Sequence, residues 1–173
     1  IFMQIDLIAQ IKTYEDFIEN YKDGDEKKLF HGKNLLFYSL SNTKVNERYK
    51  ISNFLIEKNI DPNGINAEGQ NVFHVLLAQN TNELSEVIKL CKYFFMMGVD
   101  VNQKDKNGQM PIHYLAKMGK KDEELNEIYN LFFSQDNLDL FSKDKIGYTP
   151  IEFVAKLPYR KNLLERMLLY VQK

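Results

Sequence analysis

Apolar residues recur at intervals of three and four positions in two long segments of the chain. They are Leu84, Val87, Ile88, Cys91, Tyr93, Phe94 and Phe95 in the first segment, and Leu125, Ile128, Leu131 and Phe132 in the second. This spacing places the side chains on one face of an α-helix. The pattern therefore predicts a helix in each segment, with its apolar face turned toward a core.

The two ends of the chain show the same helical spacing. Near the N-terminus it predicts a pair of short helices on Ile5, Leu7, Ile8, Ile11, Tyr14, Phe17, Ile18 and Tyr21. Near the C-terminus it predicts one helix with a buried stripe of Leu163, Leu164, Met167, Leu168 and Val171. We expect the polar residues there to face water, namely Arg160, Lys161, Glu165, Arg166 and Gln172. Both ends are interpreted as caps on the core between them.

An internal repeat organises the sequence between these ends. Three stretches align from an initial glycine through an apolar run, at 69–77, 108–116 and 147–155, with a fainter copy at 32–40. The initial residues Gly32, Gly69, Gly108 and Gly147 are 37, 39 and 39 positions apart. A second signature, rich in Asn and Asp, precedes the later three copies at 59–63, 98–102 and 137–141. One such unit cannot bury its apolar face alone, so the repetition predicts stacking into one core.

Proline and glycine mark the boundaries of the predicted helices. Pro111 and Pro150 suit the first turn of a helix, where a missing N–H costs nothing. Gly98 suits a left-handed residue that ends a helix. The glycine that opens each unit permits a tight turn. Each copy therefore predicts a turn, a short first helix and a longer second helix.

The repeat resembles the ankyrin repeat, whose consensus runs G-x-T-P-L-H-x-A-A and then G-A-D-V-N. Residues 110–119, Met-Pro-Ile-His-Tyr-Leu-Ala-Lys-Met-Gly, carry the strongest likeness, and the resemblance covers residues 30–173. An ankyrin unit has about 33 residues, and the copies in this chain are longer. The surplus falls between the two helices of a unit, as at 80–83 and 120–123.

The resemblance implies an all-α fold, an ankyrin-repeat solenoid of stacked helix-turn-helix units joined by β-hairpin-like turns, with terminal capping helices. One continuous domain would comprise an N-terminal helical cap or degenerate repeat at 1–30, repeats at 31–68, 69–107 and 108–146, and a C-terminal capping repeat at 147–173. Ankyrin first helices usually carry paired alanines. This chain has Leu76-Leu77, Leu115-Ala116 and Val154-Ala155 instead, so the curvature of the array cannot be taken from the consensus.

Composition narrows the class of protein. The chain has 173 residues, of which 44% are hydrophobic, so it can bury a core without metals or disulfides. A net charge of -1 argues against disorder and against a basic nucleic-acid-binding surface. No apolar run approaches the length of a membrane span. The single cysteine and the absence of a signal-peptide pattern favour the cytoplasm.

The sequence holds few candidates for chemistry. His74 and His113 occupy the motif's histidine position, to which the resemblance assigns structural hydrogen bonds within and between units. Cys91 lies in an apolar helical run and is expected to pack in the core. A mixed pattern of lysine and aspartate at the hairpin tips is interpreted as a solvated edge rather than a phosphate-binding track. It comprises Lys104, Asp105, Lys106, Lys143, Asp144 and Lys145. We therefore predict no catalytic residue, no metal ligand and no cofactor.

The resemblance also implies a partner-binding surface on the concave side, made of hairpin tips and the exposed ends of the first helices. The corresponding positions are Ala67, Glu68, Gln70, Gln79, Lys106, Asn107, Gln109, Lys117, Met118, Lys145, Ile146, Tyr148, Lys156 and Leu157. Tyrosine is frequent among residues that dominate interface energies, so Tyr148 is a candidate anchor. Ile146 and Leu157 either form the interface centre with it or cover the edge of the last unit.

These observations predict a non-catalytic, monomeric module that binds another protein, with no nucleic-acid or membrane partner. One alternative is a bacterial immunity protein that neutralises a toxin, because such proteins include small stand-alone ankyrin arrays. The abundance of Lys, Asn and Ile is typical of an AT-rich, bacterial genome. A second alternative is an enzyme or small-ligand-binding protein that uses the groove. The sequence argues against this second alternative, because titratable groups do not cluster at corresponding positions of the repeat units.

Overall fold

The computed structural model describes residues 2–173 and is all-helical over that range. Its helices are α1 (Ile5–Ile11), α2 (Tyr14–Asn20), η1 (Asp25–Lys27), α3 (Leu35–Leu40), α4 (Val45–Glu57), α5 (Val72–Leu77), α6 (Leu84–Met96), α7 (Pro111–Ala116), η2 (Asp122–Leu125), α8 (Asn126–Phe133), α9 (Pro150–Ala155), η3 (Pro158–Arg160) and α10 (Lys161–Tyr170). Within this range no helix is both long and apolar enough to cross a membrane.

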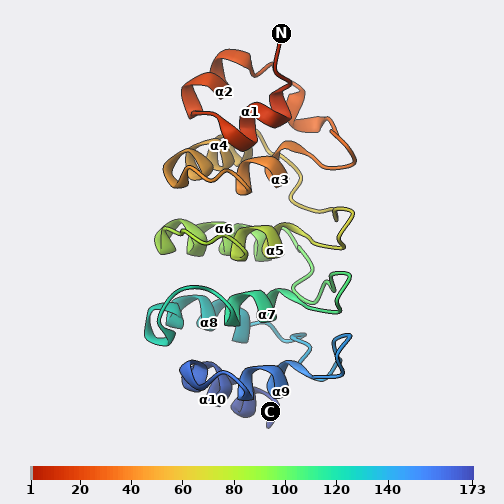
Figure 1. The fold of residues 1–173 in the computed structure, drawn as a ribbon, viewed down its shortest axis with the longest axis vertical. Coiled ribbons are helices and arrows are strands. Elements are labelled where there is room, and N and C mark those ends of the chain that lie inside the picture. The colour runs from red at the N-terminus through yellow and green to blue at the C-terminus, as the bar shows by residue number, and fades with distance from the viewer. Residues whose placement is uncertain (1) are drawn as a thin grey trace.

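The helices form pairs that stack as layers along the long axis (Figure 1). From the N-terminus these layers are α1/α2, α3/α4, α5/α6, α7/α8 and α9/α10. The first helices of successive layers contact one another in order, and so do α6, α8 and α10 among the second helices. Loops at 61–71, 100–110 and 139–149, called the hairpins below, project from the same side of the stack. Each layer thus packs only against its neighbours.

Local sequence explains where the helices begin and end. Asn34 and Asn71 cap the N-termini of α3 and α5 by accepting a backbone N–H, and Thr149 caps α9 in the same way. The prediction for Pro111 and Pro150 is confirmed, because each is the first residue of its helix. Gly98 has a φ of 73°, so its predicted left-handed conformation after α6 is also confirmed.

The core runs through the stack between the first and second helices. Phe73 lies against Phe94, Phe95 and Phe132 at centroid separations of 5.3, 4.8 and 5.8 Å, which joins two layers through aromatic contacts. Cys91 is completely buried, as predicted, and burial raises the pKa of its thiol to about 12. The thiol is therefore protonated near neutral pH and packs as a small apolar group.

The predicted end helices are confirmed as α1, α2 and α10, with two corrections at the C-terminus. Leu163 and Met167 are buried as expected, but Leu168 is 43% exposed, because its position lies beside the face of α10 that carries Leu163 and Met167. Arg160 was expected to face water and is instead 1% exposed. Its guanidinium is satisfied inside the protein by backbone carbonyl groups, which makes the burial of a charge tolerable.

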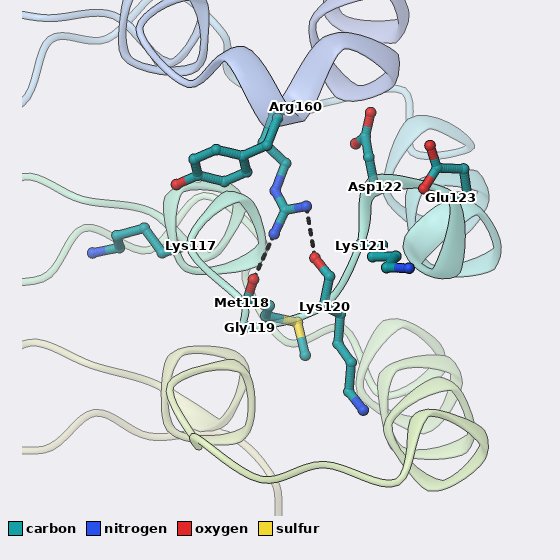
Figure 2. Close-up of a pocket in the computed structure, with 9 residues that line it drawn as sticks. Lys117, Met118, Gly119, Lys120, Lys121, Asp122, Glu123 and Arg160 are labelled. Carbon is teal, nitrogen blue, oxygen red and sulfur yellow. Dashed lines mark hydrogen bonds between the residues drawn. The ribbon is translucent and has the colours of Figure 1, made fainter.

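Arg160 fixes the loop between α7 and α8. Its Nε donates to the carbonyl of Ala116 at 2.7 Å, Nη1 to that of Lys120 at 2.9 Å, and Nη2 to that of Met118 at 2.5 Å. Figure 2 shows the last two of these bonds. A second buried arginine, Arg48, donates to the carbonyls of Asn42 and Thr81, in the loops of two successive layers. Buried arginines therefore stabilise loops that lack secondary structure.

Candidate interaction surface

Each hairpin is built around one polar side chain that accepts backbone N–H groups. The Asn66 carbonyl oxygen Oδ1 accepts from Glu68 and Gln70 at 3.0 and 2.9 Å. Asp105 Oδ1 accepts from Asn107 and Gln109 at 2.8 and 2.9 Å, and Asp144 Oδ1 accepts from three successive residues at 3.0 Å. These three residues are each 39 positions apart. The same turn is therefore repeated in three layers.

The interpretation of Asp105 and Asp144 as part of a solvated edge is wrong. Their exposed fractions are only 8% and 7%, because their carboxylates point into the hairpins to bind backbone N–H groups. Lys106 and Lys145, which follow them, are exposed as expected. The signal for this turn was present in the sequence as Asn or Asp three residues before each hairpin glycine.

The hairpin tips contact one another through the backbone. The N–H of Lys106 donates to the carbonyl of Glu68 at 2.8 Å, and the N–H of Lys145 donates to that of Asn107 at 2.9 Å. Gly108 is needed for two reasons. Its φ is 74°, and a Cβ there would lie 3.0 Å from the Asp144 Cα. The tips therefore form a continuous edge along the stack.

The hydrogen bonds predicted for the histidines within and between units are confirmed for His74, whereas His113 makes only the bond within its unit. His74 Nδ1 accepts the N–H of Asn71 at 3.1 Å, so the proton lies on Nε2, which donates to the carbonyl of Gln109 in the next layer at 3.0 Å. His113 Nδ1 accepts the N–H of Met110 at 2.9 Å. Among residues 2–173, no three His, Cys, Asp or Glu side chains are grouped so that they could hold a metal ion.

Tyr114 connects two hairpins at the base of the surface. Its hydroxyl donates to Asp105 Oδ2 at 2.5 Å and accepts from Gln70 Nε2 at 2.9 Å. Its ring packs edge-on against His74 with the centroids 4.8 Å apart. Burial and the bond to Asp105 raise the pKa of Tyr114 to about 12. The network therefore satisfies the second oxygen of Asp105.

The next layer lacks this network because Phe153 stands where Tyr114 stands. Phe153 packs against His113 as Tyr114 packs against His74, with the centroids 5.1 Å apart. Phenylalanine has no hydroxyl, and Asp144 Oδ2 is buried without a hydrogen-bond partner. Nε2 of His113 is likewise buried and without a partner. The two layers thus provide an internal comparison of the same site with and without one hydroxyl.

Phe153→Tyr is expected to raise the free energy of unfolding by about 1 kcal/mol, because the added hydroxyl can donate to the unpartnered Asp144 Oδ2. Tyr114→Phe, the reverse change one layer earlier, should lower it by a similar amount. Urea-induced unfolding monitored by circular dichroism measures both. The layers would not be equivalent if Tyr114→Phe lowered the free energy of unfolding while Phe153→Tyr left it unchanged or lowered it.

The structure places the expected partner-binding residues along the hairpins and the C-terminal ends of the first helices. Those that are exposed are Ala67, Glu68, Lys106, Asn107, Lys117, Lys145, Ile146 and Lys156, and those that are half-buried are Gln70, Gln79, Gln109, Tyr148 and Leu157. We call these thirteen residues the hairpin–helix surface. Ile146 is 79% exposed and so does not cover the last unit, whereas Leu157 packs partly against the core.

Met118 does not belong to this surface. It was expected to be exposed, but its exposed fraction is 4%, because the chain turns inward after α7, where Arg160 binds the Met118 carbonyl. Lys117, immediately before it, is exposed. The structure therefore leaves a basic side chain at the surface in this layer and places the apolar one beneath it.

Two adjoining hollows lie beside the C-terminal end of α7. The first, of about 620 Å³, lies between residues 117–123 and Tyr159 and Arg160 (Figure 2). The second, of about 530 Å³, lies between residues 77–80 and residues 114–119, with Gln70 at its edge. They share residues 117–119. Sequence reasoning missed Lys120, Lys121 and Tyr159, since they lie outside the repeat motif, the two lysines in a loop and Tyr159 in η3.

No family model and no curated protein matches the chain. Among solved structures, it is similar to a functionally unknown protein from Leptotrichia buccalis C-1013-b, whose crystal structure has been determined. The two are 32% identical, with a TM-score of 0.85, and the match covers 98% of this chain and 93% of the Leptotrichia chain. An identity of this size over nearly the whole of both chains shows common descent. The chain therefore belongs to the same family as this Leptotrichia buccalis protein.

Proposed function

We propose that the chain is an ankyrin-type repeat array that binds another protein through the hairpin–helix surface. The observation that carries the proposal is the regular edge formed by three equivalent hairpins, whose tips are joined by backbone hydrogen bonds. Backbone turns that repeat in every layer hold variable side chains at fixed spacing. Such a scaffold suits recognition, because the side chains at the tips can differ without changing the fold.

The titratable groups with displaced pKa values favour this proposal over an enzyme. Burial lowers the pKa of both His74 and His113, and the pKa of Asp105 is lowered despite its burial, because it accepts hydrogen bonds from Tyr114 and the backbone. All three side chains are engaged within the stack. His74 donates to a carbonyl group of the next layer, and the Tyr114 hydroxyl donates to Asp105 and accepts from the preceding hairpin. Tyr114 borders the smaller hollow, but its hydroxyl is already engaged by Asp105 and Gln70, so packing and these hydrogen bonds account for the shifts.

Tyr148→Ala is expected to weaken binding of the partner by about 1–2 kcal/mol or more while the fold is retained. Tyr148 lies half-buried at the base of its hairpin, where its ring can pack against a bound chain. The measurement is affinity capture from the native cell extract with mass spectrometry, followed by titration of the purified partner. Met96→Ala, an exposed position at the end of α6, is the matched control.

A protein that is retained by the wild type and by Met96→Ala but lost from Tyr148→Ala supports the proposal. Met118→Ala is unsuitable for this test, because Met118 is buried and its loss would disturb the core. Equal retention by a correctly folded Tyr148→Ala variant would remove Tyr148 from the interface. If no protein were retained even at low salt, recognition of a protein would be contradicted.

A further inference from the structure

Two lysines on the hairpin–helix surface are held in place by uncharged groups. Lys117 Nζ donates to Gln109 Oε1 at 2.6 Å and lies 4.6 Å from the centroid of the Tyr114 ring. Lys156 Nζ donates to the Tyr148 hydroxyl at 2.7 Å and lies 3.9 Å from the centroid of that ring. The two lysines are 39 positions apart and occupy the same place in successive layers. Both ammonium groups are therefore oriented while their charge stays unneutralised.

Three carboxylates of the same layers are buried in the protein, whereas Glu123 is exposed and borders the larger hollow. Asp105 and Asp144 are buried in their hairpins, as described above. Asp122 is also buried, and its two oxygens accept from the Tyr129 hydroxyl at 2.7 Å and the N–H of Asn162 at 2.6 Å. Of the four ion pairs found within residues 2–173, Lys106–Glu68 alone involves the hairpin–helix surface.

Further positive charge lines the larger hollow beside Lys117. Lys120 and Lys121 both border it, and the side chains of Lys117 and Lys120 extend away from Arg160 in different directions (Figure 2). The guanidinium of Arg160 is occupied by carbonyl groups and cannot pair with a ligand. In the preceding layer, the position that corresponds to Lys117 is Ala78. At this position of the repeat, a lysine is therefore present in the layers α7/α8 and α9/α10 and absent from α5/α6.

We propose that the partner protein presents an acidic segment to this surface, and that its carboxylates pair with Lys117 and Lys156. The inference rests on the proposed function and specifies the chemistry of the partner. Partial burial lowers the pKa of Lys117, and a carboxylate at this position would compensate for the lost hydration. Packed helices lie about 10 Å apart. An extended segment rises roughly 3.3 Å per residue, so acidic residues at every third position would match the layers.

The probe is a fluorescein-labelled peptide made of repeated Glu-Gly-Gly units. It is titrated with the intact chain at low ionic strength. Lys117→Glu/Lys156→Glu should weaken its binding at least about tenfold, because two attractions become repulsions. Lys89→Glu/Lys92→Glu changes the net charge equally at exposed positions of α6 and should alter binding less than about twofold. Circular dichroism verifies that both variants are folded.

Equal weakening by the two double variants, or no binding of the peptide to the wild type, would overturn the inference. A single-stranded oligonucleotide of equal charge that bound more tightly than the peptide would overturn it in favour of a nucleic acid. The proposed function is tested separately by the Tyr148→Ala capture. If the captured protein were lost from Tyr148→Ala but kept by Lys117→Glu/Lys156→Glu, protein recognition would stand and the acidic segment would be wrong.

Discussion

Arg160→Met is expected to lower the free energy of unfolding by about 3 kcal/mol, the largest effect of any change considered for this chain. The guanidinium is buried and donates to the carbonyls of Ala116, Met118 and Lys120. Methionine fills much of the volume but donates no hydrogen bond, so three carbonyl groups lose their partner. Urea-induced unfolding of the variant and the wild type measures the difference.

Arg166→Met is the matched control for Arg160→Met. Arg166 lies in α10, which follows directly after Arg160, and donates to Asn130 Oδ1 at the surface, where water can replace the arginine. We expect a change below about 0.5 kcal/mol for this variant. If both substitutions had the same small effect, the Arg160 contacts would not stabilise the loop between α7 and α8.

Acidification from pH 7 to pH 4.5 is expected to cost about 2 kcal/mol of stability through His113 alone. Burial lowers the pKa of His113 to about 4, with Asp144 partly opposing the shift. The unfolded chain has the ordinary histidine pKa near 6.5 and therefore binds the proton first. The stability that depends on neutral His113 is fully present above the pKa of the unfolded chain, and it is lost as the pH falls toward 4.

The pH dependence can be assigned to its source by substitution. Burial also lowers the pKa of His74, so the wild type should lose stability through both histidines. Asp105, whose pKa is lowered from an ordinary value of 3.8, contributes only at still lower pH. His113→Gln should reduce the slope of unfolding free energy against pH between 6.5 and 4.5. An unchanged slope would mean that His113 is not buried as a neutral side chain.

Much of the fold could be predicted because its determinants are local in sequence. Helical spacing indicated α6, α8, the N-terminal pair α1/α2 and the C-terminal helix α10. Pro111 and Pro150 indicated helix starts, and Gly98 indicated a helix end. The regular distance between the hairpin glycines indicated stacked layers. These signals depend on residues within one unit, and one unit is short enough to be interpreted by itself.

Two of the errors concern side chains positioned by another layer or by a following loop, and the third concerns a turn within one hairpin. Arg160 appears polar in the helical pattern, yet the carbonyls it binds come from positions as much as 44 residues earlier. Asp105 and Asp144 were interpreted together with the lysines beside them, although their position three residues before a glycine indicates a turn in which the side chain accepts backbone N–H groups. Met118 was assigned to the surface by its position in the motif, although the following loop turns it inward. Local patterns contain no information on the contacts of Arg160 and Met118.

The layered arrangement also bears on how the chain folds. Its hydrogen bonds between layers join residues close in sequence. The two of widest separation cited above, Gln70–Tyr114 and Arg160–Ala116, each span 44 positions of the 173. Few long loops must be closed before stabilising contacts form, so the contact order is low for a protein of this length. Folding can begin in any pair of adjacent layers and extend in both directions, and a growing chain can form its first layers before its last have been synthesised.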